Sequence, residues 1–298
     1  ERHDGQAVTT EDFVRALEDA SGVRLQQFRH WYSQAGTPVV RAERRYDAAA
    51  RTYTLTFTQR CPPTPGQPDK LPFHIPIAMA LLGPDGEELP LCLRGEAEIR
   101  RGTRILQLCG EQESFIFENV DYEPVPSLLR GFSAPVRLEA YYDETELGFL
   151  FAKDPEPFCR WEAGQQLASR LLLTLARARQ AGEALAVPPA FTTALRDVLS
   201  AELDPAFRAV ALSLPGETYL AEFMDEIDPQ ALHAARLYLR RTLAASLRDE
   251  WLDCYRRLGN AGRVRFDAEA MGRRDLRNLC LSYLMELEAD AEVLDLCL

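Results

Sequence analysis

Few side chains in this sequence are of a type and spacing that suits catalysis. His3 and Asp4 are adjacent and could act as an imidazole–carboxylate dyad. A base of this kind must lie within reach of the group from which it takes a proton. The pair precedes Gly5 and has no nucleophile near it in sequence, so we interpret it as part of a loop.

His74 and Cys61 are two further candidates. His74 lies between Phe73 and Ile75 in an alternating stretch, so we expect its imidazole on the polar face of a strand rather than in a ligand set. Cys61 precedes two prolines and is expected to be exposed, but nothing near it in sequence would activate its thiol. We therefore assign neither residue a functional role.

Three carboxylates, at Glu111, Glu113 and Glu118, could form an acid–base pair. They flank the segment Phe115-Ile116-Phe117, which has the composition of a core strand. Acidic residues at the borders of a short strand are expected to be solvated. The sequence thus predicts no catalytic, cofactor-binding or metal-binding residue in this chain.

The elements that position these residues begin with two helices. Thr9 is expected to cap the first, with Asp12 as the acid of a capping box, and Ser21-Gly22 ends it. A second helix is predicted from Arg24 to Gln34. Its buried side holds apolar residues at helical spacing: Leu25, Phe28, Trp31 and Tyr32.

The segment from Trp31 to Val40 changes from helix to strand within a few residues. Gly36 supplies the positive φ of a helix C-terminal cap, and Pro38 forbids helical continuation. A helical layer that ends so early suggests that the chain begins near the end of one domain. We expect the two helices to expose an apolar face unless the sandwich or a neighbouring copy covers it, with Phe13, Leu17 and Phe28 among its residues.

The middle of the chain is predicted to be β-structure. From Arg51 to Thr58 the apolar residues alternate with threonines, as in an antiparallel sheet with one solvated face: Tyr53, Leu55 and Phe57. A proline-rich loop at 61–70 precedes the next strand, and a turn at 83–86 follows it. That strand alternates at Phe73, Ile75, Ile77, Met79 and Leu81. With shorter strands at 88–93, 103–108, 114–120 and 136–142, these segments indicate a small antiparallel β-sandwich.

From about Glu144 the apolar period becomes helical. Three Asp-Pro pairs are expected to place a capping acid before a proline at a helix start: Asp154-Pro155, Asp204-Pro205 and Asp228-Pro229. The longest helix is predicted from Pro229 to about Leu258, and another from Ala268 to Glu288. The apolar stripe of the longest helix comprises Leu232, Leu239, Leu243, Leu247, Trp251, Tyr255 and Leu258. Short polar turns between helices favour a solenoid-like α-helical domain, and no fixed-length repeat is found.

The composition is typical of a cytoplasmic globular protein. The 298 residues are 46% hydrophobic, which is enough for two domain cores. No apolar run is long enough to span a membrane. An odd number of cysteines without a Cys-x-x-Cys motif predicts reduced, mostly buried thiols: Cys61, Cys92, Cys109, Cys159, Cys254, Cys280 and Cys297.

The charge excludes a nucleic-acid-binding protein. The chain carries 34 Lys and Arg against 46 Asp and Glu, for a formal net charge of −12, whereas a phosphate-binding surface needs an excess of bases. The two arginine clusters, Arg240-Arg241 and Arg273-Arg274-Arg277, lie among acids. We expect both to be solvated helix faces with ion pairs at i,i+4 spacing.

Several stretches carry a family resemblance. They are Glu1-Arg2-His3-Asp4-Gly5, Asp12-Phe13-Val14, Glu18-Asp19-Ala20, the run from Phe28 to Pro38, the run from Val125 to Val136, and Leu276-Arg277-Asn278-Leu279-Cys280. Together they resemble the bacterial aminopeptidase N (alanyl aminopeptidase) family of zinc metallopeptidases, over nearly the whole chain. The resemblance implies that residues 1–36 close a catalytic domain, that 37–143 form a β-sandwich domain, and that 144–298 begin a C-terminal α-helical domain. The apolar end from Val293 to Leu298 is expected to pack on helices that follow.

The zinc site of that family is implied to lie in another part of the parent enzyme. Its signature is His-Glu-x-x-His, in which two imidazoles bind the metal and the Glu is the general base. The four histidines here are followed by Asp4, Trp31, Ile75 and Ala234, and no two are four residues apart. The Gly-Ala-Met-Glu-Asn run that binds the substrate's amino group in the family is also absent.

Two functions are compatible with the sequence. In the first, the chain is a structural interdomain segment of a zinc aminopeptidase that removes N-terminal residues from peptides. It then braces the catalytic domain and helps wall the peptide-access chamber, and its partner is the rest of its own polypeptide. In the second, it is a self-standing, non-enzymatic module that binds a protein. The two helices before Gly36 favour the first, because a self-standing module has little need of them.

Overall fold

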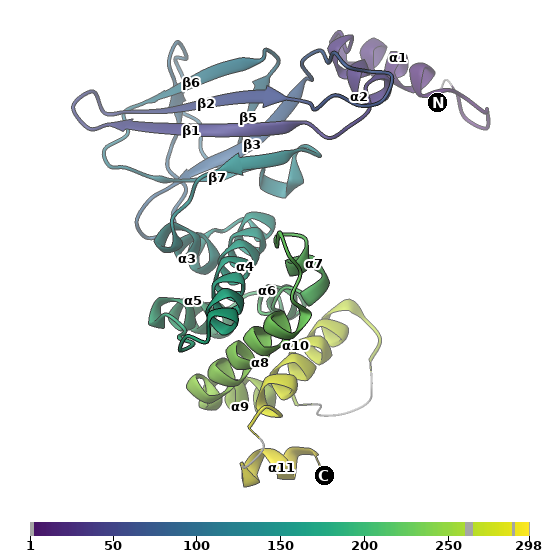
Figure 1. The fold of residues 1–298 in the computed structure, drawn as a ribbon. Coiled ribbons are helices and arrows are strands. Elements are labelled where there is room, and N and C mark those ends of the chain that lie inside the picture. The colour runs from purple at the N-terminus through teal and green to yellow at the C-terminus, as the bar shows by residue number, and fades with distance from the viewer. Residues whose placement is uncertain (1–2, 260–264, 288–289, 298) are drawn as a thin grey trace. The chain divides into compact units, whose positions relative to one another are not determined.

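The computed structural model describes residues 3–259, 265–287 and 290–297. The chain forms two compact units, each with its own core. The first comprises residues 1–81 and 88–141, and holds two N-terminal helical segments and a β-sandwich. The second comprises residues 82–87 and 142–298 and is helical (Figure 1). A β-sandwich followed by a helical domain is the predicted fold class.

Helix α1 (Thr10–Ser21) begins and ends where its capping residues predict. The Thr9 hydroxyl accepts a hydrogen bond from the Asp12 amide at 3.2 Å, and the Asp12 carboxylate accepts one from the Thr9 amide at 3.0 Å. Gly22 adopts a φ of 71°, the left-handed conformation that ends many helices. The predicted capping box and stop are confirmed.

The second predicted helix is shorter than expected. A 3₁₀ turn, η1 (Gln27–Arg29), leads into the four-residue helix α2 (His30–Ser33), whose C-cap is Gln34. The predicted end is confirmed, and the predicted start at about Arg24 is wrong. The indole Nε1 of Trp31 donates to the His74 carbonyl at 3.0 Å and holds this short helical segment against the sandwich. Tyr32 is exposed rather than buried. Gly36 has the predicted positive φ, 97°, but lies beyond the end of the helix.

Eight strands of the described residues form two sheets. The five-stranded sheet has the order β4-β6-β2-β1-β8, and the three-stranded sheet has the order β5-β3-β7. Strand β1 pairs antiparallel with β2 and parallel with β8. The strands are β1 (Val39–Asp47), β2 (Thr52–Arg60), β3 (Ile75–Leu82), β4 (Cys92–Leu93), β5 (Arg104–Leu108), β6 (Gln112–Glu118), β7 (Val125–Leu128) and β8 (Arg137–Ala140).

The alternating residues of β2 and β3 build the sandwich core. Those predicted to point inward are buried, among them Tyr53, Leu55, Phe57, Ile75 and Met79. Strand β3 is buried on both faces, whereas the alternation of apolar residues in its sequence predicted burial on one face only. The turn at 83–86 is confirmed by the hydrogen bond from the Gly86 amide to the Gly83 carbonyl at 2.9 Å.

Two short strands depart from the prediction. Strand β4 covers only Cys92–Leu93 of the expected 88–93, and β7 (Val125–Leu128) had no predicted strand at all. The sequence did not indicate β7 because it contains Pro126. Proline has no backbone N–H to donate to a neighbouring strand, so it argues against a strand. It is tolerated here because β7 lies at the edge of its sheet.

The helices of the second unit follow one another along the chain, as Figure 1 shows. Helix α3 packs on α4 and α5, α4 packs on α8, and α10 packs on both α6 and α9. Their bounds are α3 (Glu144–Lys153), α4 (Pro157–Ala181), α5 (Pro189–Ser200), α6 (Pro205–Ala211), α7 (Glu217–Ala221), α8 (Pro229–Ser246), α9 (Arg248–Arg257), α10 (Ala268–Leu284) and α11 (Ala291–Cys297).

Two of the three Asp-Pro caps are confirmed. Asp204 and Asp228 accept hydrogen bonds from Phe207 and Ala231 amides, each at 2.9 Å, at the starts of α6 and α8. The cap at Asp154 is wrong. It ends α3 instead, and Glu156 caps α4.

The predicted longest helix is also wrong, because it divides at Leu247 into α8 and α9. Leu247 departs from helical geometry with φ −123° and ψ 26°. The apolar stripe of the predicted helix nevertheless stays buried through Trp251 to Leu258. The spacing of apolar residues in the sequence therefore did not reveal the break between α8 and α9. The longest helix of the described residues is α4, with 25 residues. The predicted end of α10 at Glu288 lies outside the described residues.

Candidate functional site

The histidines do not converge in the structure. His74 contacts the side chain of Gln107, on the neighbouring strand, and is half-buried. His3 contacts Gln6 at 3.4 Å instead of forming a dyad with Asp4. The two remaining contacts are His30 with the Pro72 carbonyl at 2.9 Å and His233 with Glu217 at 3.1 Å.

The three candidate carboxylates each occupy a different environment. Glu113 accepts hydrogen bonds from the Cys109 and Gly110 amides at 2.8 and 2.7 Å and stabilises a turn. Glu118 pairs with Arg94 at 2.9 Å, and Glu111 is exposed. They do not form an acid–base pair.

Cys61 and the Phe115–Phe117 segment differ in detail from expectation. Cys61 is half-buried rather than exposed, with its Sγ 3.6 Å from the Ala35 carbonyl oxygen. Phe117 is a core residue, whereas Phe115 and Ile116 are half-buried. Three of the six described cysteines are half-buried and three are buried, so the thiols are less enclosed than predicted.

Within the described residues, no three His, Cys, Asp or Glu side chains lie close enough together to hold a metal ion. The donor set that a catalytic zinc needs, three protein ligands and an open position, is not available from these side chains. We therefore derive no metal-dependent step from this chain.

The arginine clusters are more enclosed than solvated helix faces. Arg240 donates to Glu286 at 3.0 Å and Arg277 donates to the Tyr255 hydroxyl at 3.0 Å, and both arginines are half-buried. These contacts join α10 to α8 and to α9, rather than joining residues four apart on one helix. The prediction of i,i+4 pairs is wrong for them, because sequence spacing does not show which helices meet.

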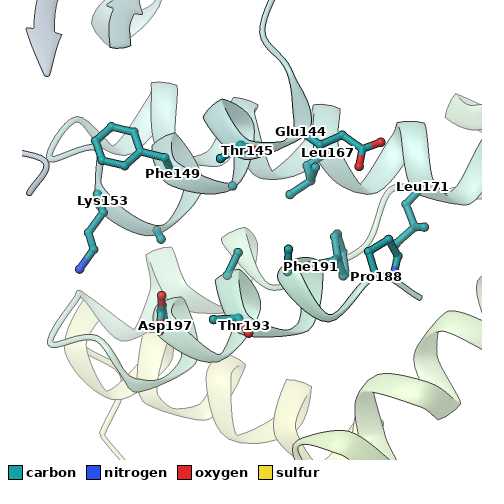
Figure 2. A pocket seen from close by; sticks show the side chains of 14 residues that line it. Glu144, Thr145, Phe149, Lys153, Leu167, Leu171, Pro188, Phe191, Thr193 and Asp197 are labelled. Carbon is teal, nitrogen blue, oxygen red and sulfur yellow. The ribbon is translucent and has the colours of Figure 1, made fainter. Parts of the chain in front are cut away.

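The candidate binding site of the helical unit is an apolar groove between α3 and α5, with α4 at its base (Figure 2). It has a volume of about 440 Å³. The apolar lining comes from Phe149, Leu167, Leu171, Pro188 and Phe191. Three charged groups lie at its rim, Glu144, Lys153 and Asp197.

The local sequence explains why the groove exists. Gly148 faces α5, where a Cβ on it would lie 4.0 Å from the Cβ of Ala194. Small residues on both helices therefore leave space that larger side chains would fill. Helix α3 is held on α4 by Arg160, whose Nε donates to the Phe151 carbonyl at 3.0 Å. Burial lowers the pKa of this guanidinium, although the nearby Asp154 opposes the shift.

The groove is suited to binding apolar groups. Its lining includes neither a histidine nor a cysteine, and its only hydroxyls are those of Thr145 and Thr193. Figure 2 shows Lys153 and Asp197 at one end and Glu144 at the other. The small residues Gly148, Ala152, Ala190 and Ala194 are the signal in the sequence that could have indicated it.

A charge network that the sequence did not reveal holds α1 to η1. The Arg29 guanidinium donates to Glu11 at 2.9 Å and to Glu18 at 2.8 Å. These hydrogen bonds, with one from the Leu25 amide, lower the pKa of Glu18 to about 2. Glu11 and Glu18 lie seven residues apart, two helical turns, which is the pattern that could have indicated a shared partner.

A second network lies inside the sandwich unit. Arg130 is buried and donates to the Ser127 hydroxyl at 3.1 Å and to the Thr103 hydroxyl at 2.6 Å. Glu88 completes it with an ion pair at 2.5 Å. Arg130 follows Leu129, a non-glycine residue with a φ of 57°. The network therefore fixes a strained turn between β7 and β8.

No helix in the part of the chain that the structure describes is long and apolar enough to cross a membrane.

Two family matches divide the chain. Residues 36–141 match the family described as "Domain of unknown function (DUF3458) Ig-like fold". Residues 144–297 match "Domain of unknown function (DUF3458_C) ARM repeats". These descriptions agree with the β-sandwich and the stacked helices.

Curated relatives match nearly the whole chain. Aminopeptidase N of Escherichia coli (strain K12) is 43% identical over 286 residues, which is 95% of this chain and 32% of the relative. Aminopeptidase N of Haemophilus influenzae is 37% identical over 283 residues, again 95% of this chain and 32% of the relative. Aminopeptidase N of Caulobacter vibrioides is 43% identical over 284 residues, 95% of this chain and 31% of the relative. The chain spans about a third of the length of these relatives.

A solved structure shares the fold. The crystal structure of Legionella pneumophila aminopeptidase A in complex with aspartic acid matches with a TM-score of 0.78 and 28% identity. The match covers 96% of this chain and 32% of that chain.

Proposed function

Because the chain belongs to the DUF3458_C family of ARM repeats and is homologous to about a third of bacterial aminopeptidase N, we propose that it is a non-catalytic, structural segment of a zinc-dependent aminopeptidase. The parent removes N-terminal amino acids from peptides. The observation that carries the proposal is the 43% identity over 95% of this chain, within only 32% of the relative. In this proposal zinc is bound by another part of the parent, where the resemblance to the family places the His-Glu-x-x-His signature.

In this proposal the segment braces the catalytic domain and helps wall the chamber through which peptides reach it. Helix α1 supports this role, because only Val14 of its apolar residues is buried while Phe13 and Leu17 are 57% and 42% exposed. The predicted third member of this face, Phe28, is half-buried. An apolar face without a partner suits contact with a neighbouring part of the same polypeptide.

We keep the three-part division of the chain within this proposal: 1–36 as the end of a catalytic domain, 37–143 as the sandwich domain, and 144–298 as the first part of the helical domain. We also propose a cytoplasmic location. Six free cysteines in the described residues support it, because reduced thiols persist in that compartment.

Zinc content and peptidase activity test the proposal directly. The purified chain is expected to retain less than stoichiometric zinc by elemental analysis and to leave an aminoacyl anilide uncleaved. One zinc per chain together with turnover would overturn the assignment.

Complementation tests the bracing role and separates it from the alternative of a self-standing interaction module. The remaining segments of a bacterial aminopeptidase N are produced separately and mixed with this chain. We expect association and a gain in anilide turnover, both weakened at least tenfold by the double substitution Phe13→Glu and Leu17→Glu. The matched control changes two exposed residues of the other unit, Val210→Glu and Met271→Glu. Folded chain that neither associates nor restores turnover favours the self-standing module.

A further inference from the structure

Two thiols meet at the contact between α9 and α10. The helices run antiparallel, as two contacts show: Trp251 stacks on Tyr283 with ring centroids 4.4 Å apart, and Arg277 donates to the Tyr255 hydroxyl at 3.0 Å. Cys254 and Cys280 lie between these contacts, and each is the largest influence on the pKa of the other. Both are buried, with 2% and 0% of their surfaces exposed.

A guanidinium faces this pair. Arg208 of α6 places Nη2 3.5 Å from the Cys254 Sγ and also donates to the Leu199 carbonyl. Its Nε is buried and has no hydrogen-bond partner among the described residues. A partly buried cation needs a compensating negative charge. The Cys254 thiolate is the group in position to supply it.

Helix α6 is fixed where it holds Arg208. At one end a Cβ on Gly272 of α10 would lie 2.8 Å from the Ala206 amide nitrogen, so the two backbones are in close contact. At the other end the Tyr283 hydroxyl donates to the Leu212 carbonyl at 3.0 Å. The guanidinium is therefore held at the thiol by the fold rather than by a mobile loop.

The surroundings make the two thiols unequal. The hydrogen bond from Cys280, with the positive charges of Arg208 and Arg257, outweighs burial and lowers the pKa of Cys254 to about 7. The pKa of Cys280 is raised, because its proton is held by Cys254 and because it is buried. Near neutral pH Cys254 therefore supplies a thiolate, the reactive form of cysteine, while Cys280 stays protonated beside it.

We propose that Cys254 and Cys280 form an oxidisable dithiol, which a hydroperoxide converts into a disulfide between α9 and α10. The Cys254 thiolate attacks one oxygen of hydrogen peroxide, so that an S–O bond forms and the O–O bond breaks. The other oxygen leaves as hydroxide and becomes water with one proton. The Cys280 sulfur then attacks the resulting sulfenic acid, the S–S bond forms, and the S–O oxygen leaves as water with the Cys280 proton. Two thiols lose two electrons and the peroxide gains them.

The test oxidises the intact 298-residue chain with hydrogen peroxide and follows each cysteine. Samples are quenched, alkylated under denaturing conditions, and analysed by peptide mass spectrometry. We expect a Cys254–Cys280 cross-linked peptide that forms before Cys109 is modified, because burial and Glu113 raise the pKa of Cys109. The rate should rise with pH around a midpoint near the Cys254 value. No cross-link when Cys109 is already oxidised, or a rate independent of pH, would overturn the proposal.

Variants assign the roles within the pair. Cys280→Ala should stop the reaction at a Cys254 sulfenic acid that dimedone traps, and Cys254→Ala should abolish both products. Arg208→Gln should slow cross-linking at pH 7 about fivefold, because a pKa rise of about one unit cuts the thiolate fraction from about a half to about a tenth. Arg177→Gln, an exposed arginine of α4, is the matched control and should have no effect.

Circular dichroism and thermal unfolding establish that each variant is folded. An unchanged rate in folded Arg208→Gln would remove the guanidinium from the mechanism and overturn the proposal. If that variant does not fold, the pH profile of the unmodified chain decides instead.

Discussion

At the scale of single residues, the structure depends on arginines that the sequence does not distinguish from surface charges. Arg130 is 4% exposed and bonded on several sides, whereas Arg94 forms an exposed pair with Glu118. Both arginines have an acidic partner, and only the folded structure shows that one pair is buried and the other exposed. A buried charge that loses its partner is costly, while an exposed pair contributes little.

Replacing the acid of each pair tests this difference. Glu88→Gln removes the charge that compensates buried Arg130, so we expect the free energy of unfolding to fall by about 2–3 kcal/mol. Glu118→Gln is the matched control at an exposed pair and should cost less than about 1 kcal/mol. Urea denaturation followed by circular dichroism measures both. Equal losses would contradict the burial argument.

Acid sensitivity is also a property of single residues. The pKa of Glu18 is lowered from its ordinary 4.5 to about 2 by Arg29 and the Leu25 amide, and that of Asp290 from 3.8 to about 2 by Arg248. A lowered carboxyl pKa stabilises the folded state above the unfolded value and loses that effect as pH falls through the folded value. We therefore expect stability to fall between about pH 4.5 and pH 2.

The Arg29→Gln variant isolates the Glu18 contribution. Its unfolding free energy should depend less steeply on pH between about 4.5 and 2 than that of the unmodified chain. Arg15→Gln, which loses only an exposed pair at 3.5 Å to Glu11, is the control and should keep most of the slope. Denaturation curves at a series of pH values give the comparison, and identical slopes for all three proteins would contradict the assignment.

At the scale of elements, the features that depend on residues close together in sequence were predicted correctly in most cases. The capping box at Thr9, the alternation of β2 and the caps at Asp204 and Asp228 all depend on neighbours within a few residues. Failures arose where tertiary contacts decide. Trp31 binds the His74 carbonyl, which is distant in sequence, and an edge position lets β7 accept Pro126. The groove and the Arg130 network likewise join segments that are distant in sequence.

Close helix contact at Gly272 gives an element-scale prediction. Gly272→Ala gains about 1 kcal/mol of helix propensity, but its Cβ would meet the Ala206 amide nitrogen at 2.8 Å. Overpacking against backbone costs about 1–3 kcal/mol, so we expect a net loss of up to about 2 kcal/mol. Gly148→Ala is the control, since its Cβ has 4.0 Å to Ala194 and should be neutral or stabilising. Thermal unfolding ranks the two, and a stabilised Gly272→Ala would contradict the contact.

At the scale of the whole molecule, the two units have separate cores. A substitution in one should therefore act mainly within that unit. In the Gly272→Ala variant, we expect faster amide hydrogen exchange in α6 and α10, with β2 unchanged. Equal acceleration in β2 would show that the chain opens as a single cooperative body.

The division into units has a consequence for biosynthesis, because residues 82–87 belong to the helical unit although the sandwich sequence surrounds them. Gly86 has a φ of 86°, and a Cβ there would lie 2.8 Å from the Lys153 Cβ and 2.9 Å from its carbonyl oxygen. Lys153 follows Gly86 by 67 residues (153 − 86). At a translation rate of about 5–20 residues per second, the turn leaves the ribosome about 3–13 s before the end of α3. The turn that α3 contacts is therefore synthesised several seconds before the helix itself, so the helical unit cannot close around Gly86 until the sandwich sequence between them has been made.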